Sequence, residues 1–463
     1  MKETIISNGL IVTEKKQFKA DIRIIGEKIK EIGSSLKKIN NSTKVIDAQG
    51  LTILPGGIDP HVHLSLPGYV PEKYRWADDF ESGSKAALAG GITSMGCISV
   101  PDKQELPLGT IARETEKAEK KLIADLFIHP VIQNPTNETI KQLSKLPEKG
   151  CTSIKVFMVT DDFEQHSREY LELLYTAKKT NLITMIHCED NNIIKTTCEK
   201  MIKNGKGSLE NYADSRPVIS EVVATQRAVA MCEVTKAPMY IVHLSSKRAL
   251  DVCSEAQERQ LPVFVEGRPI FFYYTREKYQ DDDGPLYVVQ PPLREKEDLE
   301  SLWKGLQNSK ITTLATDHAP HMKEHKLDPT LNVANLLPGI NELQTMLPMF
   351  YTKAVQTKKI SLKKFVALTS TNAAHLFGLY PRKGTIQEGA DADLVLWDFS
   401  EKREIKDEDM FSQAGFSIYH GMKTTGWPHV TIRRGEIVYE EGKIFSKAGS
   451  GKVLFCKQPQ IIK

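Results

Sequence analysis

The stretch Ile58-Asp59-Pro60-His61-Val62-His63 follows a short apolar run, Leu51-Thr52-Ile53-Leu54. This pattern is typical of a buried strand that ends in two histidines. Because residues i and i+2 of a strand point to the same side, we expect both imidazoles to face one point in space. Neutral imidazole is a common ligand for zinc and similar metals. Taken alone, the pair fits a metal site and two hydrogen-bonded polar residues about equally well.

The composition is that of a globular protein, with 463 residues, 40% hydrophobic and 26% charged. This length exceeds one ordinary core and suits a barrel with a smaller domain. Sixty-two basic and fifty-nine acidic residues leave a formal charge of +3, which excludes the basic footprint of a nucleic-acid-binding protein. We expect no membrane span, because no apolar run is long enough, and no signal peptide after Met1.

The seven cysteines are scattered, odd in number and without a C-x-x-C pair. This usage argues against a framework of disulfides. A reducing compartment fits better, so we predict a cytoplasmic location.

The rhythm of apolar residues changes near residue 51. Before it, short alternating segments separated by Gly and Asn predict strands without a helix. After it, apolar runs alternate with helix-length segments such as residues 80–88, 168–178, 221–234 and 247–260. The eight runs are residues 51–54 leading to His61, then 91–100, 122–132, 152–159, 182–187, 239–244, 261–265 and 311–315. Eight β-α alternations predict an α/β fold, a closed parallel (β/α)₈ TIM-like barrel.

Both ends of the chain predict a second, smaller domain. A further helix is expected at residues 361–377, where Ser361 suits an N-cap. Short strands follow, the last at residues 430–439. Neither terminal piece has enough apolar surface for a core of its own. We therefore predict a β-sandwich built from residues 1–52 and 384–463 beside a barrel of residues 53–383, with the last dozen residues as an extended tail.

Residues of the kinds that bind metals lie at the ends of five predicted strands. They are His61 and His63, Lys155, His187, His243, and Asp317. Read separately, His187 and His243 could be core histidines. Lys155 could extend its ammonium to solvent, and Asp317 could cap the next helix. A lysine inside an apolar strand is costly unless it is neutralised or paired. One metal centre explains all six residues and is favoured, since active sites of this fold draw on several strand ends.

This set, in this order, resembles the amidohydrolase superfamily, in particular its cyclic-amidohydrolase branch of hydantoinases, dihydropyrimidinases, allantoinases and dihydroorotases. The likeness covers nearly the whole chain. The other matching segments are residues 55–63, 77–83, 86–93, 291–294, 335–339, 389–395 and 421–422, with the strand at 430–438.

The resemblance implies two divalent metal ions, with zinc as the expected metal. His61 and His63 would bind the first ion together with Asp317. His187 and His243 would bind the second. Metal coordination lowers the pKa of water to around 7, so the site would supply a bridging hydroxide at neutral pH.

The resemblance also assigns the two remaining roles. Lys155 would be carboxylated by CO₂ and would bridge both ions, so that a buried cation becomes an anion. Asp317 would be the catalytic residue that takes the proton of the hydroxide and passes it to the leaving amide nitrogen. Hydantoinase-like relatives further imply a homotetramer.

Two positions depart from the dihydroorotase pattern. Those enzymes usually have an arginine two residues after the second histidine and an asparagine after the proline that ends strand two. Here these positions hold Ser65 and Asp102. Neither can hold a substrate carboxylate in that way, and Asp102 would repel it. Dihydroorotase, like allantoinase, is therefore the alternative to a hydantoinase or dihydropyrimidinase.

Three further positions are predicted on the substrate side. Hydantoinases usually place a tyrosine five residues after the lysine, where this chain has Thr160, and a serine before the Pro-Pro-Leu-Arg run, where it has Gln290. Asn335, whose family counterpart contacts the cyclic ureide, is retained. The metal chemistry therefore looks intact and the pocket altered. Further loop candidates for specificity, for which a surface or packing role is at least as expected, are Arg75, Trp76, Arg268 and Tyr273.

A different class of relative must be weighed. Some proteins on this scaffold are non-catalytic scaffolding proteins that have lost metal ligands. This chain keeps all six ligand positions. We therefore predict a metal-dependent hydrolase that opens a small cyclic amide or ureide, of the hydantoin or dihydropyrimidine type.

Overall fold

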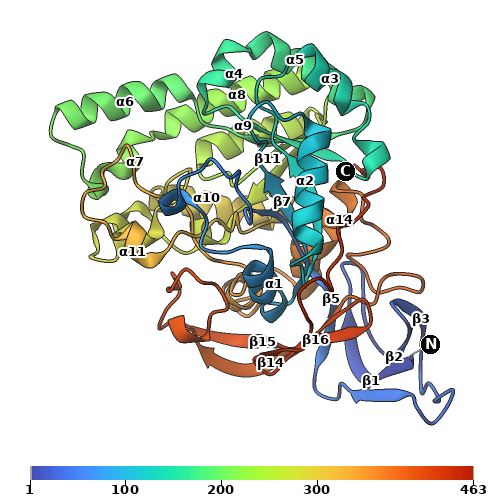
Figure 1. Ribbon diagram of the computed structural model, residues 1–463. Coiled ribbons are helices and arrows are strands. Elements are labelled where there is room, and N and C mark those ends of the chain that lie inside the picture. Colours follow the sequence, from blue (N-terminus) through green and yellow to red (C-terminus); the bar gives the residue numbers. More distant parts are fainter. Residues whose placement is uncertain (1–2, 462–463) are drawn as a thin grey trace.

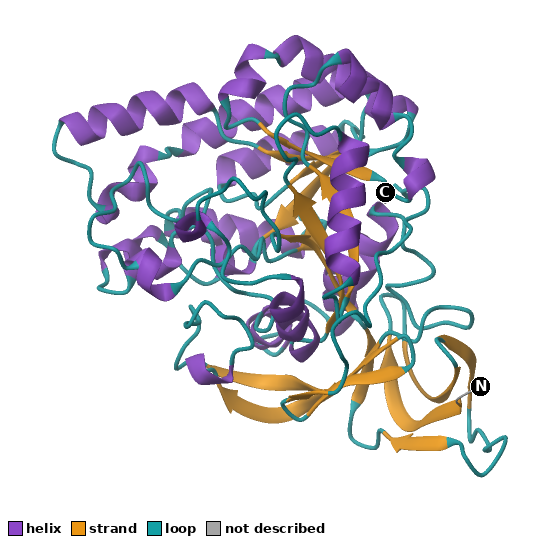
Figure 2. Cartoon of the chain, in the orientation of Figure 1, coloured by secondary structure: helices purple, strands orange, loops and turns teal. Residues whose placement is uncertain are grey.

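The computed structural model describes residues 3–461, and strands from both ends of this chain form one mixed sheet. Nine strands run in the order β17-β16-β15-β14-β5-β1-β2-β3, with β4 paired to β1. Figure 2 shows strands of this sheet in orange at the lower side of the molecule. The strands are β1 (Glu3–Val12), β2 (Gln17–Ile25), β3 (Lys28–Gly33), β4 (Lys44–Asp47), β5 (Thr52–Pro55), β14 (Leu394–Glu404), β15 (Lys423–Arg433), β16 (Glu436–Glu440) and β17 (Lys443–Ile444).

Strand β5 joins the two terminal pieces. It pairs in parallel with β1 and antiparallel with β14. Side chains from both pieces, including Ile11, Ile53 and Leu396, are buried in one apolar cluster. The two ends of the chain therefore share an apolar cluster.

The strand predicted at residues 51–54 leading to His61 is wrong in one respect, because the structure divides it into two strands. β5 belongs to the mixed sheet, whereas β6 (Gly57–Val62) begins a parallel sheet. Gly56 lies between them, and a Cβ atom there would be 2.2 Å from Thr93 Oγ1. Only glycine fits where the chain crosses so closely from one sheet to the other.

Eight parallel strands make up the second part of the described chain. They form a sheet of order β6-β7-β8 and a sheet of order β13-β12-β11-β10-β9. Single parallel bridges, Val62 with His318 and Val131 with Lys155, join the edges of these sheets. The remaining bounds are β7 (Ile92–Ser99), β8 (Asp125–Pro130), β9 (Ser153–Phe157), β10 (Ile183–His187), β11 (Met239–Ile241), β12 (Val263–Gly267) and β13 (Thr313–Leu314).

Helices alternate with these strands and cover them from outside (Figure 1). They are α1 (Phe80–Ala89), α2 (Pro107–Glu119), α3 (Asn137–Leu143), α4 (Asp161–Gln165), α5 (Ser167–Lys179), α6 (Asn191–Lys203), α7 (Tyr212–Ser215), α8 (Val218–Thr235), α9 (Lys247–Glu258), α10 (Lys296–Gln307), α11 (Lys323–Lys326), α12 (Met346–Phe350), α13 (Leu362–Val366) and α14 (Asn372–Leu376). The helix predicted at 361–377 is present as α13 and α14, which a π-helical segment at Ala367–Thr371 connects. Ser361 Oγ accepts a hydrogen bond from Lys364 N.

The last described residues pack against the strands. Leu126 N donates to Lys452 O, and Leu454 N donates to Leu126 O, so the extended tail follows β8. Cys456 is buried there. Among residues 3–461, no helix combines the length and the hydropathy that a membrane span requires.

Candidate metal centre

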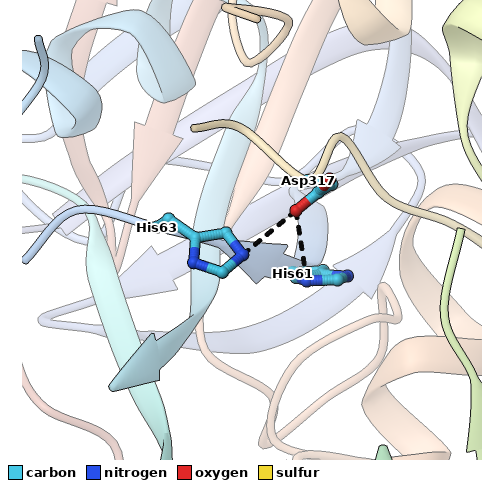
Figure 3. Close-up of side chains that lie close together, drawn as sticks. All are labelled: His61, His63 and Asp317. Carbon is cyan, nitrogen blue, oxygen red and sulfur yellow. Dashed lines mark ion pairs between the residues drawn. The ribbon is translucent and has the colours of Figure 1, made fainter. Parts of the chain in front are cut away.

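Two histidines and an aspartate meet where β6 and β13 end (Figure 3). Asp317 Oδ1 lies 3.3 Å from His61 Nε2 and 3.0 Å from His63 Nε2. Candidate ligand atoms of all three residues lie within 4.8 Å of one another. The alternation of a strand therefore brings both imidazoles to one carboxylate, as expected from the sequence. We call these residues the Asp317 group.

A second pair of histidines lies beside this group. His187 ends β10 and His243 follows β11, and their Nδ1 and Nε2 atoms are 3.1 Å apart. The ring centroids of His243 and His61 are 5.5 Å apart. Two zinc bonds of about 2.0–2.1 Å at a tetrahedral angle place their donor atoms about 3.4 Å apart. The spacings in this histidine pair and in the Asp317 group therefore suit shared metal ions.

Lys155 is buried in β9 close to both clusters. Among the described residues its Nζ atom has no hydrogen-bond partner, and it lies 4.9 Å from the centroid of the Phe157 ring. Burial lowers the pKa of Lys155 to about 8, although the charges of Glu266 and Asp317 oppose this shift. An unpaired ammonium is costly to bury, so this position favours a chemically changed or metal-associated lysine.

The unpaired atoms of the cluster fit a divalent metal site. Within residues 3–461, His61 Nε2 is also buried without a hydrogen bond. Burial lowers the pKa values of His61, His187 and His243. Their imidazoles are therefore neutral at pH 7, which is the form that binds metals. Imidazole nitrogen and carboxylate oxygen are suitable ligands for zinc or a similar ion.

A model of the amidohydrolase family matches residues 52–438 of the chain. The chain belongs to the amidohydrolase family. It is 33% identical over 459 residues to a D-hydantoinase of Ralstonia pickettii, covering 98% of each chain. It is 34% identical over 458 residues to a D-hydantoinase of Geobacillus stearothermophilus, covering 97% and 95%. The crystal structure of dihydropyrimidinase from Brevibacillus agri matches with a TM-score of 0.92 at 31% identity, over 99% of each chain.

These relatives confirm the cyclic-amidohydrolase branch that the motifs predicted. Membership in the amidohydrolase family implies divalent metal binding. The buried, unpaired ligand atoms of the cluster are consistent with this implication.

Glu266 is a buried carboxylate beside the metal cluster that the sequence analysis missed. It lies in β12, and its Oε1 atom is 2.9 Å from His61 Nδ1 and accepts a hydrogen bond from His243 N. A carboxylate at Nδ1 holds the proton there and leaves Nε2 free as a ligand. Burial raises the pKa of Glu266 to about 7. The signal in the sequence was a single acidic residue, Glu266, directly after the apolar run at 261–265.

Glu189 has the corresponding place beside the histidine pair. Its Oε2 atom is 2.8 Å from His187 Nε2. Arg216 donates to both carboxylate oxygens of Glu189. His187 is therefore oriented with Nδ1 toward His243. The sequence analysis assigned Glu189 no role.

The three predicted substrate-side residues lie on loops and turns. Thr160 is half-buried, and its hydroxyl accepts from Phe163 N at the start of α4. Gln290 is half-buried. Asn335 is exposed, and its Oδ1 atom accepts from Asn332 N. Two of these side chains thus support local backbone, and their substrate contacts remain a prediction.

The four loop candidates have different environments. Arg75 is exposed and donates to Val70 O and Gly68 O. The ring of Trp76 lies 5.5 Å from that of His63, and the hydroxyl of Tyr273 donates to Met349 O. Arg268 is fully buried and donates to Asp317. Only Trp76 and Arg268, among these four, contact the Asp317 group.

Proposed function

We propose that this amidohydrolase opens a cyclic amide or ureide ring of the hydantoin or dihydropyrimidine type. The proposal is carried by the buried cluster of ligand-type residues in a chain 33% identical to a D-hydantoinase. The oxygen of water would bond to the ring carbonyl carbon, and the carbonyl carbon–nitrogen bond would break. The ring nitrogen would gain a proton, giving an N-carbamoyl or amide acid.

Two divalent ions are proposed, with zinc as the expected metal. The Asp317 group would hold one ion and the histidine pair the other. A carbamate on Lys155 would bridge them, and its buried, unpaired Nζ atom supports this assignment. Carboxylation would replace a buried cation with an anion, which removes the cost of an unpaired ammonium. When bound, the ions supply Lewis-acid activation of water and of the scissile carbonyl.

Asp317 is the proposed general base and acid. Its Oδ1 atom faces His61 and His63, whereas Oδ2 is held by Arg268. Burial alone would raise the pKa of Asp317, but the guanidinium of Arg268 and the neighbouring histidines hold it well below the ordinary value. The carboxylate therefore starts the reaction ionised, takes a proton from the attacking water and delivers it to the leaving ring nitrogen.

The substrate is proposed to be a neutral or weakly polar ring of five or six atoms. Ser65 and Asp102 stand where a carboxylate-binding arginine and asparagine would be needed. Arg75 and Arg268 could have replaced them, but their guanidinium groups already donate to other residues. Each missing charge-assisted partner costs about 1–3 kcal/mol in recognition, so dihydroorotate should bind poorly.

A hydrolysis panel tests the proposal. Metal-replete protein is assayed with hydantoin, dihydrouracil, allantoin, dihydroorotate and simple cyclic imides. The expected result is a higher kcat/KM for at least one neutral ring than for dihydroorotate, with modest turnover of plain hydantoin and dihydrouracil. The Lys155→Ala variant, prepared in parallel, controls for contaminating hydrolases. A kcat/KM for dihydroorotate above that of every neutral ring would make the protein a dihydroorotase.

A barrel with a smaller domain is the proposed arrangement of the fold. The bridges Val62–His318 and Val131–Lys155 support closure of the two parallel sheets into a (β/α)₈ barrel. The apolar cluster that strands of both terminal pieces bury supports the proposed β-sandwich. The proposed domains are residues 1–52, 53–383 and 384–463, with β5 straddling the first boundary.

Light scattering at micromolar concentration should show a homotetramer. The seven free cysteines in the described chain support a cytoplasmic location.

A further inference from the structure

Arg268 is a buried arginine that holds one residue of the metal cluster at two points. It follows β12 and is 0% exposed. Its Nη1 atom donates to Asp317 Oδ2 at 2.6 Å, and Nη2 donates to the backbone oxygen of Asp317 at 3.1 Å. The planar guanidinium fork thus connects the carboxylate of Asp317 to its own main chain. A lysine could not make both bonds in this geometry.

The backbone of Asp317 needs such support. Its φ is +48°, in the left-handed region that non-glycine residues uncommonly adopt. In this conformation Oδ1 lies within 3.3 Å of both His61 Nε2 and His63 Nε2. Because Arg268 occupies Oδ2, the carboxylate presents only Oδ1 to the histidines.

A second carboxylate accompanies the guanidinium. Glu342 Oε2 lies 3.6 Å from Arg268 Nε, and Glu342 Oε1 accepts from the hydroxyl of Tyr419 at 2.6 Å. Arg268, Glu342 and Tyr419 are all buried. The guanidinium therefore lies between two carboxylates that would otherwise be buried without a cation.

This environment argues against a substrate-binding role for Arg268. A guanidinium that recognises a substrate carboxylate must turn unused N–H groups toward the pocket. Here Nη1 and Nη2 each give one N–H to Asp317, and the side chain is 0% exposed. Among the described residues Nε has no hydrogen-bond partner and is also buried.

We propose that Arg268 is the positioning residue for Asp317. It holds Oδ2 and the main-chain oxygen so that Oδ1 points to the metal ligands and to the reacting water. The catalytic part of this inference rests on the proposed function, whereas the metal-binding part rests on the geometry of the Asp317 group alone.

The test compares Arg268→Ala and Arg268→Lys with the wild-type chain. Zinc affinity is measured by competition with a chromophoric chelator, and kcat and KM are measured on the best neutral ring. Loss of a residue that orients a ligand typically costs 10–100-fold in metal affinity, and a misplaced group about 100-fold in rate. We expect losses of about this size in Arg268→Ala, with KM changed less than about threefold, and smaller losses in Arg268→Lys.

Chemical rescue separates positioning from packing. Millimolar guanidinium chloride should restore at least about tenfold of the lost kcat in Arg268→Ala, whereas sodium chloride of equal ionic strength should not, because only guanidinium can reproduce the forked contacts. Arg433→Ala is the matched control, since Arg433 is an equally buried arginine in the mixed sheet. It should keep wild-type zinc affinity and kcat, with no response to guanidinium.

Three results would overturn the proposal. The first is wild-type zinc affinity and kcat in Arg268→Ala. The second is a loss of kcat that guanidinium does not restore. The third applies if circular dichroism shows that Arg268→Ala is unfolded. In that case, wild-type zinc affinity and kcat in Arg268→Lys would show that a positive charge alone suffices. If the wild-type chain hydrolyses no ring in the panel, the proposed function fails, while zinc affinity still tests the role of Arg268.

Discussion

The metal-facing and substrate-facing sides of the site are built differently. On the metal-facing side, His61, His187 and Asp317 are each held by a further side chain, and these supporting side chains are buried. On the substrate-facing side, Thr160 caps a helix and Asn335 closes an exposed turn. The proposed metal chemistry would therefore depend on strand ends with fixed partners, whereas the proposed specificity would depend on loops. A family resemblance therefore predicts the metal-facing residues of a new chain better than its substrate-facing residues.

The largest effect should come from the metal-facing side at Lys155. Lys155→Ala should lose most bound metal and about 10³-fold or more in kcat/KM, because the metal supplies several kcal/mol of transition-state stabilisation. Elemental analysis should find close to two divalent ions per wild-type chain. Activity assays should show that short carboxylic acids, added to the variant together with metal, restore part of the turnover. Lys383→Ala is the control, since Lys383 is buried against Asp125. A single ion in the wild type, or full activity in Lys155→Arg, would contradict the bridging role.

An intermediate effect is expected at Glu266, which supports the same side indirectly. Glu266→Gln keeps the shape but weakens the acceptor for His61 Nδ1 and His243 N. Zinc affinity should fall about 10–100-fold, as for other residues that orient metal ligands. Titration calorimetry with zinc measures the change, and Glu258→Gln, at an exposed ion pair with Lys310, is the control. Unchanged affinity would mean that His61 needs no carboxylate partner.

A smaller effect is expected on the substrate-facing side at Thr160. Thr160→Tyr restores the residue usual in hydantoinases but removes the hydroxyl that accepts from Phe163 N. Unfolding free energy should fall by about 1 kcal/mol, the typical value of an N-cap. The ratio of kcat/KM for a ring with a small substituent to kcat/KM for the same ring with a bulky substituent should rise. Steady-state kinetics on this matched pair of substrates measures the ratio. Thr136→Tyr, which removes the cap of α3, should lower stability without this shift.

The smallest effect is expected at Asn335. Its side chain accepts from Asn332 N, and Asn332 Oδ1 in turn accepts from Ala334 N. Asn335→Ala and Asn332→Ala should each cost about 1 kcal/mol of stability, the value of one hydrogen bond, and change kcat/KM only a few-fold. Urea denaturation and steady-state kinetics measure the two quantities. A loss above about 100-fold in Asn335→Ala alone would show that this side chain contacts the substrate directly.

Residues whose role follows from strand periodicity could be predicted from the sequence. His61 and His63 share a face because they are two residues apart, and Asp317 joins them because parallel strands end at one edge. The division at Gly56 was not predicted, although Pro55-Gly56 is a turn signal, because residues 51–54 were interpreted as one strand leading to His61. The division into β5 and β6 depends on which neighbours pair with each half.

Contacts between residues that are distant in sequence could also not be predicted. Glu266 is a single acid at the end of an apolar run, and nothing local distinguishes it from a residue at a strand end. Arg268 was predicted only as a loop residue, because complete burial of an arginine depends on Asp317 and Glu342, which are distant in sequence. Asn335 matches a family motif, but its bond to Asn332 depends on a turn that the motif does not encode.

The pairing of β5 with both β1 and β14 has a consequence for synthesis on the ribosome. Leu394, the first residue of β14, follows Pro55 by 339 positions. At about 5–20 residues per second, the outer edge of β5 waits roughly 20–70 s for its partner. During this time an apolar strand edge is open to other nascent chains. Molecular chaperones that shield the growing N-terminal strands should therefore raise the yield of folded protein, and slower elongation without them should increase aggregation.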